Sequence, residues 1–348
     1  MSTYLLEIGT EELPAKFANS SLNQLKKSLE FEFDKQSIQC KNIICTSTPR
    51  RIAVFLDGLK DFSEDLKEER KGPKAFMAFS EGNPTNAAKG FAKSLGISVN
   101  ELTIKNTDKG EFVFGTKVEK GKSTQSLLIT VIPKVIKSLQ GPRFMKWGNG
   151  NFKFSRPIRS IISLYNDEIL DFELGDCDPK IIIGRTSKGH RLMQELIEVD
   201  HASNYFDLMR NKGISIIRDE RKEEIRKLIM FNSDKLNLYP DIPSELLDEL
   251  TDLVEAPNLL LCRYSEEFLK LPAEVLCTVM KIHQRYVPLF KDARIINKLE
   301  ITSENILSTL FLCVSNGLES SNEIIKTGNE KVLKARFSDA NFFIESDK

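Results

Sequence analysis

A strand–helix–strand–strand pattern in the first sixty residues most limits the folds open to this chain. The apolar run at 3–8 has the length of a strand, and residues 14–33 follow it with helical periodicity. The apolar residues at that spacing are Phe17, Leu22, Leu25, Leu29 and Phe33. Two more apolar strands are expected at 41–48 and 51–59, joined by a tight corner. This order predicts an α+β layer in which the helix packs on one face of a sheet.

Helices and strands continue to alternate along the remaining sequence. The predicted class is therefore a multi-domain α+β fold with mixed or antiparallel sheets, ending in a helical segment. Further helices are expected at 84–95, 126–139, 244–255, 271–284 and 322–345. Residues 203–262, which include the third of these, are expected to be mainly helical. Further strands are expected at 111–119, 157–165, 168–175, from 181, and at 214–217, 285–290 and 311–316. The charged run 60–74 is interpreted as a solvated linker or lid.

These elements suggest four regions along the chain. They are the strand–helix–strand–strand unit 1–60, an inserted mainly helical region 61–140 with one strand hairpin, a β-rich region 141–200 with basic turns, and an α/β region 201–348 ending in a long helix. No glycine or proline closes that last helix, so we expect the sequence to be a piece of a longer protein.

The charge balance excludes a globally basic nucleic-acid binder. Lys+Arg and Asp+Glu both number 50, which leaves only a local basic patch for contact with phosphates. The six cysteines form no C-x-x-C pair and only three histidines accompany them, so no metal site is predicted. The sequence shows neither a signal peptide nor an apolar run long enough to span a membrane, and a cytoplasmic location is expected.

The opening segment EIGTEELPAKF places Glu11 and Glu12 directly before the first predicted helix. Carboxylates at a helix start are stabilised by the helix dipole, which is the simplest interpretation. Acid/base or metal chemistry needs a further partner, and a free-standing hydrolase using Glu11, Glu12 and His190 stays open as an alternative.

The common nucleotide and catalytic motifs are missing from the sequence. It has no phosphate-binding G-x-x-x-x-G-K-[ST], no dinucleotide G-x-G-x-x-G after a strand and no G-x-S-x-G. The glycine-rich GNGNF at 148–152 is interpreted as a hairpin turn rather than a phosphate loop. No catalytic residue is therefore predicted.

Four Arg/Lys-bearing turns stand out instead, because guanidinium forks on rigid turns suit phosphate oxygens and a neighbouring ring can stack on a base. They supply the candidate RNA or partner contacts Arg50, Arg51, Arg143, Lys146, Trp147, Arg156, Arg159, Arg185, His190 and Arg191. The alternatives are a core position for Trp147, ion pairs of Arg50 and Arg51 with Glu11 or Glu12, and a loop role for His190. A protein-interaction scaffold would scatter these basic residues over different faces.

Taken in order, these segments resemble the β subunit of bacterial heterotetrameric glycyl-tRNA synthetases. The blocks that carry the resemblance are LLEIGTEELPAKF, TPRRIAVFLDGL, KGPKAF, PTNAAKGFAKSLGI, PRFMKWG, FSRPIRSIISLY, GRTSKGHR, LTDLVEAPNLLLCRYSEEFLKLPAEVL and GNEKVLKARFSDANFF. Several blocks of ten or more residues in one order are a far more specific signal than any single motif.

The resemblance implies a role in glycine attachment to tRNA without catalysis by this chain. In the family, glycine and ATP with Mg are used by a separate α subunit, while the β subunit recognises and positions tRNA(Gly) within an α2β2 assembly. No cofactor is expected on this chain itself. The family's β chain is about twice as long, and its HD-like and anticodon-binding domains have no counterpart in this sequence.

Overall fold

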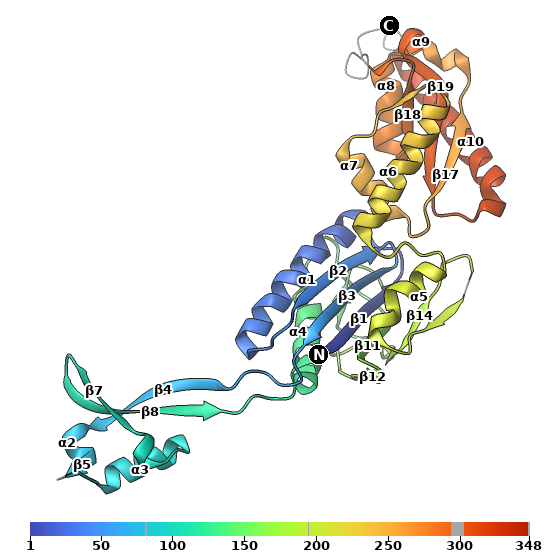
Figure 1. The fold of residues 1–348 in the computed structure, drawn as a ribbon. Helices are drawn as coiled ribbons and strands as arrows, with labels where there is room; N and C mark the ends of the chain where they lie inside the picture. Colours follow the sequence, from blue (N-terminus) through green and yellow to red (C-terminus); the bar gives the residue numbers. More distant parts are fainter. Residues whose placement is uncertain (81, 194, 294–302, 347–348) are drawn as a thin grey trace.

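The computed structural model describes residues 1–80, 82–193, 195–293 and 303–346. The chain forms two packed bodies and a projecting arm (Figure 1). We call residues 1–60 with 124–217 the N-terminal body, residues 61–123 the arm, and residues 218–346 the C-terminal body. Helices and mostly antiparallel sheets occur in all three parts, which confirms the α+β class.

The N-terminal body is organised around a sheet of order β12-β11-β1-β3-β2, with β13 parallel to β11. Its strands are β1 (Ser2–Thr10), β2 (Asn42–Thr48), β3 (Arg51–Leu59), β11 (Ile158–Tyr165), β12 (Glu168–Ile169) and β13 (Ile183–Gly184). β1 lies antiparallel between β3 and β11. The segments 1–60 and 141–200, separate regions in the sequence, therefore share one sheet.

Both faces of this sheet are covered, because β1 alternates between two hydrophobic clusters. Tyr4, Leu6 and Ile8 pack with α1 (Ala15–Gln36) and α4 (Thr124–Ser138). Leu5 packs on the opposite face with residues of α5 (Tyr205–Asn211). Glu7 shares that second face and is only 2% exposed. A buried carboxylate at this position needs charged or hydrogen-bonding partners.

The arm is a three-stranded sheet of order β4-β8-β7 that carries a small helical tip (Figure 1). Its elements are β4 (Leu66–Lys74), α2 (Ala75–Ala78), β5 (Phe79–Ser80), β6 (Asn83–Pro84), α3 (Asn86–Leu95), β7 (Thr103–Thr107) and β8 (Gly110–Glu119). The interpretation of 60–74 as a linker was wrong, since most of it is strand β4. Leu66 to Arg70 are exposed on both faces of the arm, so the sequence lacks the apolar alternation that would reveal a strand.

The C-terminal body has a sheet of order β16-β18-β19-β17. Its strands are β16 (Tyr239–Pro240), β17 (Asn258–Arg263), β18 (Val287–Phe290) and β19 (Leu307–Ser315). Its helices are α6 (Arg218–Lys235), α7 (Ser244–Leu253), α8 (Ala273–Thr278) with the π-helix Val279–Gln284, α9 (Ser303–Ile306) and α10 (Asn322–Ser346). α6 and α7 cover one face of the sheet, and α8 and α10 cover the other.

Most predicted elements are confirmed, with differences where tertiary pairing decides. The helices expected at 84–95, 126–139, 244–255, 271–284 and 322–345 are present, as are strands within 111–119, 157–165, 285–290 and 311–316. β17 was missed inside a stretch expected to be helical. The strand expected at 214–217 joins no sheet, although Ile214 and Ile216 are buried. Only Glu168–Ile169 of the expected strand 168–175 pairs, because the chain then leaves the sheet edge.

Two short hairpins complete the N-terminal body, β9 (Met145–Lys146) with β10 (Lys153–Phe154) and β14 (Thr186–Lys188) with β15 (Leu196–Glu198). The first confirms GNGNF as a hairpin turn. Its backbone N–H groups already donate to protein carbonyls, from Asn149 to Asp178 at 3.0 Å and from Asn151 to Asp176 at 2.9 Å. These groups are consequently not available to cradle a phosphate.

Candidate nucleic-acid interface

Three of the basic segments meet at the corner between β1 and α1. The backbone N–H of Thr10 donates to the Arg50 carbonyl at 2.8 Å, and that of Leu13 donates to the Pro49 carbonyl at 2.6 Å. The N–H of Glu11 donates to the Pro157 carbonyl at 3.1 Å. The corner is thus fixed by the turn before β3 and by the segment that enters β11. Strand pairing brings these turns together although they are far apart in the sequence.

Ion pairs add two arginines to the same corner. Arg159 Nε lies 2.6 Å from Glu11 Oε1, and Arg191 Nη1 lies 2.5 Å from Glu12 Oε1. The pKa of Glu11 is lowered by the hydrogen bond from Arg159 and further by the charges of Arg50 and Lys188, against the opposing effect of partial burial. We call Arg50, Arg159, Lys188 and Arg191 the basic rim. Four cations then face two carboxylates.

The basic rim suits a surface contact better than a small-molecule site. The cavity lined by Arg50, Arg159 and Lys188 has a volume of about 10 Å³, room for roughly one water. Ligand pockets usually measure about 300–1,000 Å³. Exposed ion pairs such as Arg159–Glu11 are worth only about 0.2–1 kcal/mol, so phosphate oxygens could compete for these guanidinium groups.

A buried polar network lies beneath the rim. The Arg51 side chain is 2% exposed and donates to Ser187 Oγ at 3.2 Å, to the Lys188 carbonyl at 3.0 Å and to Glu255 Oε2 at 3.2 Å. Its Nη1 is also 3.9 Å from Glu7 Oε2. Burial by itself would lower the pKa of Arg51, but Glu255 and Glu7 raise it above the ordinary value. The guanidinium group therefore stays charged between two carboxylates.

Hydroxyl groups donate further hydrogen bonds to these carboxylates. Ser187 Oγ donates to Glu7 Oε1 at 2.7 Å, and the Tyr205 hydroxyl donates to Glu7 Oε2 at 2.5 Å. Burial, and then the neighbouring Glu7 carboxylate, raise the pKa of Tyr205 well above its ordinary value, which keeps the phenol protonated as a donor. Thr48 Oγ1 donates to Glu255 Oε2 at 3.0 Å. The network joins the two bodies, because Glu255 follows α7.

Arg51 and His190 are buried, so we remove both from the candidate contacts. Arg51 pairs with Glu7 and Glu255 rather than with Glu11 or Glu12, since it lies on the sheet face covered by α5. His190 is 2% exposed, and its Nε2 is 3.4 Å from Asn316 Oδ1. That amide oxygen also accepts the Glu255 backbone N–H at 2.9 Å, so His190 helps to join a loop to the C-terminal body.

Trp147 is half-buried and faces the core of the N-terminal body. Its Nε1 donates to the Phe154 carbonyl at 3.0 Å, and the ring packs against the main hydrophobic cluster. A cavity of about 270 Å³ lined by Trp147, Ile158 and Arg159 lies beside the basic rim. The structure thus gives Trp147 the packing role that the sequence left open.

The remaining candidates, Arg143, Lys146, Arg156 and Arg185, do not form a single group. Arg143 and Lys146 are exposed on the β9–β10 hairpin, where Phe144 packs on Phe17 of α1 with ring centroids 5.3 Å apart. Arg156 donates to its neighbouring Ser155 carbonyl at 2.9 Å. Arg185 lies apart from the rim, because its Nη2 donates at 2.9 Å to Asp167 in the turn after β11.

Lys188 is the rim residue that the sequence analysis missed. It belongs to the GRTSKGHR segment, but the candidate set from that segment contained only Arg185, His190 and Arg191. In β14 the exposed Thr186 and Lys188 flank the buried Ser187. Applying strand alternation to this segment would have marked Lys188 as outward-facing.

The residues proposed for a hydrolase do not form a catalytic group. Glu11 and Glu12 are paired with arginines, while the His190 ring faces Asn316. Among the residues that the structure describes, no hydrogen bond joins His190 to either carboxylate. A general base needs such contact with its proton donor or with a bound water. The geometry therefore gives this alternative no support.

Residues 1–80, 82–193, 195–293 and 303–346 contain neither a cluster of metal ligands nor a helix suited to a membrane. No three His, Cys, Asp or Glu side chains there lie close enough together to hold a metal ion. No helix in those ranges combines the length and the apolar content that a membrane span requires.

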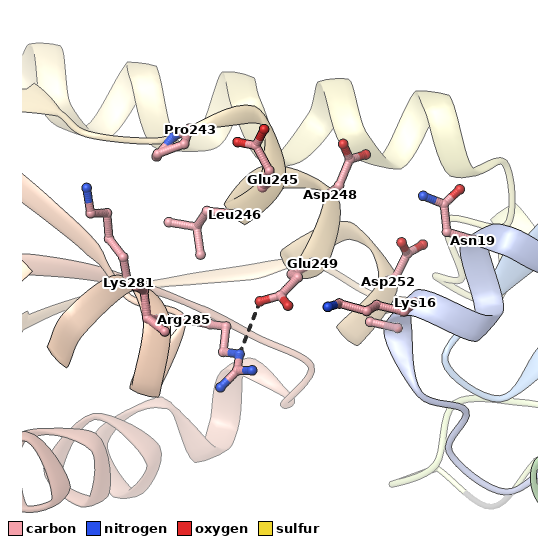
Figure 2. Close-up of a pocket in the computed structure, with 12 residues that line it drawn as sticks. Lys16, Asn19, Pro243, Glu245, Leu246, Asp248, Glu249, Asp252, Lys281 and Arg285 are labelled. Atoms are coloured by element: carbon pink, nitrogen blue, oxygen red, sulfur yellow. Dashed lines mark hydrogen bonds and ion pairs between the residues drawn. The ribbon is translucent and has the colours of Figure 1, made fainter. Parts of the chain in front are cut away.

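A larger cleft, of about 730 Å³, lies where the two bodies meet. Figure 2 shows residues that border it: Lys16, Asn19, Pro243, Glu245, Leu246, Asp248, Glu249, Asp252, Lys281 and Arg285. Asp248 pairs with Arg218 at 2.8 Å, and Glu249 pairs with Arg285 at 3.2 Å. The wall formed by α7 is acidic, and its charges are largely paired, so this cleft does not suit RNA phosphates.

Comparison with known proteins identifies relatives over the whole chain. Residues 4–348 match the family model described as glycyl-tRNA synthetase beta subunit. The glycine–tRNA ligase beta subunit of Trichodesmium erythraeum is 41% identical over 346 residues, which cover 99% of this chain and 47% of the relative. The corresponding proteins of Gloeothece citriformis and Clostridioides difficile are 38% and 39% identical, and each match covers 100% of this chain and 48% of the relative. The chain spans about half the length of these curated relatives.

Proposed function

The chain belongs to the glycyl-tRNA synthetase beta-subunit family, and from this membership we propose that it helps to bind and position tRNA(Gly) for glycylation by a separate α subunit. ATP and Mg are used by the α subunit in this proposal, and no catalytic residue is assigned to this chain. Assembly as α2β2 and a cytoplasmic location complete the proposal.

The observation that carries the proposal is the convergence of three basic segments at the β1–α1 corner. Arg50, Arg159 and Arg191 come from different parts of the sequence, and Lys188 joins them. Arginine provides bidentate contacts to phosphate oxygens, and lysine provides a point charge. A surface with such groups on a rigid sheet fixes the register of a nucleic-acid backbone without reading its bases.

The first experiment measures glycine attachment to tRNA(Gly) by the α subunit. The mixtures are α alone, α with this chain, and α with a complete β subunit. We expect charging with the complete subunit and none with α alone. Partial charging with this chain would show that its half already positions the reactants. Absence of charging in every mixture, with all proteins folded, would contradict the proposal.

The second experiment reverses charge at the rim of the complete subunit. Arg50→Glu with Lys188→Glu should lower tRNA affinity and reduce the slope of log K against log salt by about 1.5–2, since two phosphate contacts are lost. Arg226→Glu with Lys227→Glu on α6 is the matched control, because both are exposed cations away from the rim. Equal affinities for the rim variant and the control would remove the rim from the tRNA interface.

A protein-interaction scaffold remains the second candidate. The position of Arg185 favours it, because this guanidinium group is held by the carbonyls of Asp167 and Asp200 apart from the rim. This candidate predicts that the rim variant loses the α subunit while it keeps its affinity for tRNA. Sedimentation of the mixed subunits would separate the two candidates.

A further inference from the structure

The tip of the arm concentrates positive charge in a protein whose net charge is zero. Between Lys71 and Gly96 the sequence has four basic residues and one acidic residue, Glu81. The basic residues are Lys71, Lys74, Lys89 and Lys93. Helix α3 contributes no acidic residue. Such a local patch on a neutral protein is the electrostatic pattern of a nucleic-acid contact.

Ion pairing differs between the arm's tip, residues 71–96, and its stem, which is the rest of the arm. Along the stem, Arg70 pairs with Glu68 at 2.9 Å, Lys117 pairs with Glu119 at 2.6 Å, and Lys120 pairs with Asp65 at 3.4 Å. At the tip, within the described part of the chain, Lys74, Lys89 and Lys93 have no carboxylate within 4.0 Å. Unpaired ammonium groups at the tip are thus available to an external anion.

Large apolar side chains are exposed beside these lysines. Phe76 is 73% exposed and Met77 is 55% exposed, although both belong to the short helix α2. The helix is held in place, because Thr85 Oγ1 donates to the Met77 carbonyl at 2.7 Å and the Thr85 N–H donates to the Ala78 carbonyl at 2.9 Å. Lys74 Nζ lies 5.9 Å from the centre of the Phe76 ring. An exposed ring on a fixed turn is suited to stacking.

Close packing of α3 on β4 brings the lysines of the two elements near one another. A Cβ atom at Gly72 would lie 2.5 Å from the Phe91 ring, so glycine is required for α3 to approach this strand. Lys71 and Lys74 then flank the contact on β4. Lys89 and Lys93 are four residues apart and share one exposed side of α3.

We propose that the arm tip is an RNA-binding site at which Lys74, Lys89 and Lys93 contact backbone phosphates and Phe76 stacks on an unpaired base. The proposal rests on the proposed function, since tRNA is the RNA that it would hold. RNA is favoured over a protein because lysine is depleted in protein–protein interfaces, whereas lysine with an exposed aromatic ring is the usual composition of a single-strand binding surface.

The test uses the complete β subunit assembled with the α subunit, and it measures tRNA(Gly) affinity over a range of salt concentrations. Lys89→Glu with Lys93→Glu should reduce the log–log salt slope by about 1.5–2. Phe76→Ala should weaken binding about tenfold with little change in that slope. Subunit association should be unchanged in all variants.

Matched controls come from the same chain. Lys120→Glu with Lys122→Glu makes the same charge change on the stem, and Phe31→Ala removes a 65% exposed ring from α1. Circular dichroism and protease resistance of the arm would confirm that each variant is folded. Binding by the controls should equal that of the unchanged protein.

The possible outcomes separate the two proposals. If the unchanged protein binds tRNA and the tip variants bind equally well, the tip inference is overturned while the proposed function stands. If the tip variants lose the α subunit and keep tRNA, the tip is a protein-docking surface and the inference is again overturned. If the unchanged protein fails to bind tRNA, both proposals fail.

Discussion

The basic rim and the arm tip are both positively charged. Within the described residues, carboxylates pair with two of the four rim cations and with none of the tip lysines Lys74, Lys89 and Lys93. At the rim, Arg159 and Arg191 are paired with Glu11 and Glu12. At the tip, Lys89 and Lys93 are exposed on a helix without acidic residues. The rim therefore offers two arginines held in place by carboxylates, while the tip offers unpaired lysines.

The packing beneath the two regions differs as well. The rim lies on a sheet whose two faces are both covered, and on the buried Arg51 network. The tip has a core of Ala78, Ala88 and Val113, with a few half-buried neighbours. Regions with few buried apolar contacts open at lower free energy than the rest of a protein. We infer that the rim serves geometric positioning and that the tip can adapt to its ligand.

The largest effect on stability is expected in the buried Arg51 network beneath the rim. Arg51→Ala removes the cation between Glu7 and Glu255 and leaves two buried carboxylates uncompensated. The free energy of unfolding should fall by about 3–5 kcal/mol. Urea denaturation of the chain measures this change.

The adjacent residue is the control for that prediction. Arg50→Ala alters a half-buried side chain and should change the free energy of unfolding by no more than about 0.5 kcal/mol. Similar losses for the two variants would contradict the division between a buried network and an exposed rim.

A smaller effect is expected in the arm, where two glycines provide a matched pair. Gly72→Ala brings a Cβ against the Phe91 ring and should destabilise the tip by about 1–3 kcal/mol. Gly90→Ala meets no atom within 4 Å on the surface of α3 and should stabilise the tip by about 0.4–1 kcal/mol.

Hydrogen exchange of the arm amides measures both changes locally. Amides of the N-terminal body should exchange at unchanged rates, because the tip has its own separate core. Protection lost in both regions of the Gly72→Ala protein would show that the tip and the body unfold together.

The smallest effect concerns the competing carboxylates of the rim. Glu11→Gln with Glu12→Gln releases Arg159 and Arg191 and should increase tRNA affinity of the complete subunit about two- to fivefold. Glu223→Gln on α6 is the control, since Glu223 also pairs with an exposed arginine. Weaker binding after the change would mean that the carboxylates orient the arginines instead of competing for them.

Much of the fold could be predicted because strands and helices with a buried face carry their own periodicity. The spacing of Phe17, Leu25, Leu29 and Phe33 predicted α1, and all four side chains are buried. Gly96 directly follows the helix expected at 84–95, and it adopts a left-handed conformation there with φ of 69°. β4 was not predicted because its charged half, Leu66 to Arg70, buries neither face. The sequence there lacks the alternation of apolar and polar residues that marks a strand.

The sequence by itself determined most of the strands and helices, the turns that carry basic residues and the family to which the chain belongs. It could not distinguish Arg50 from Arg51, which are adjacent and chemically identical. Only the tertiary structure leaves Arg50 half-buried and buries Arg51 fully, because Arg51 meets Glu255 from 204 positions further along the chain. The physical reason is that local periodicity fixes which side of a strand a residue occupies, whereas burial and charge pairing depend on the distant segments that cover that side.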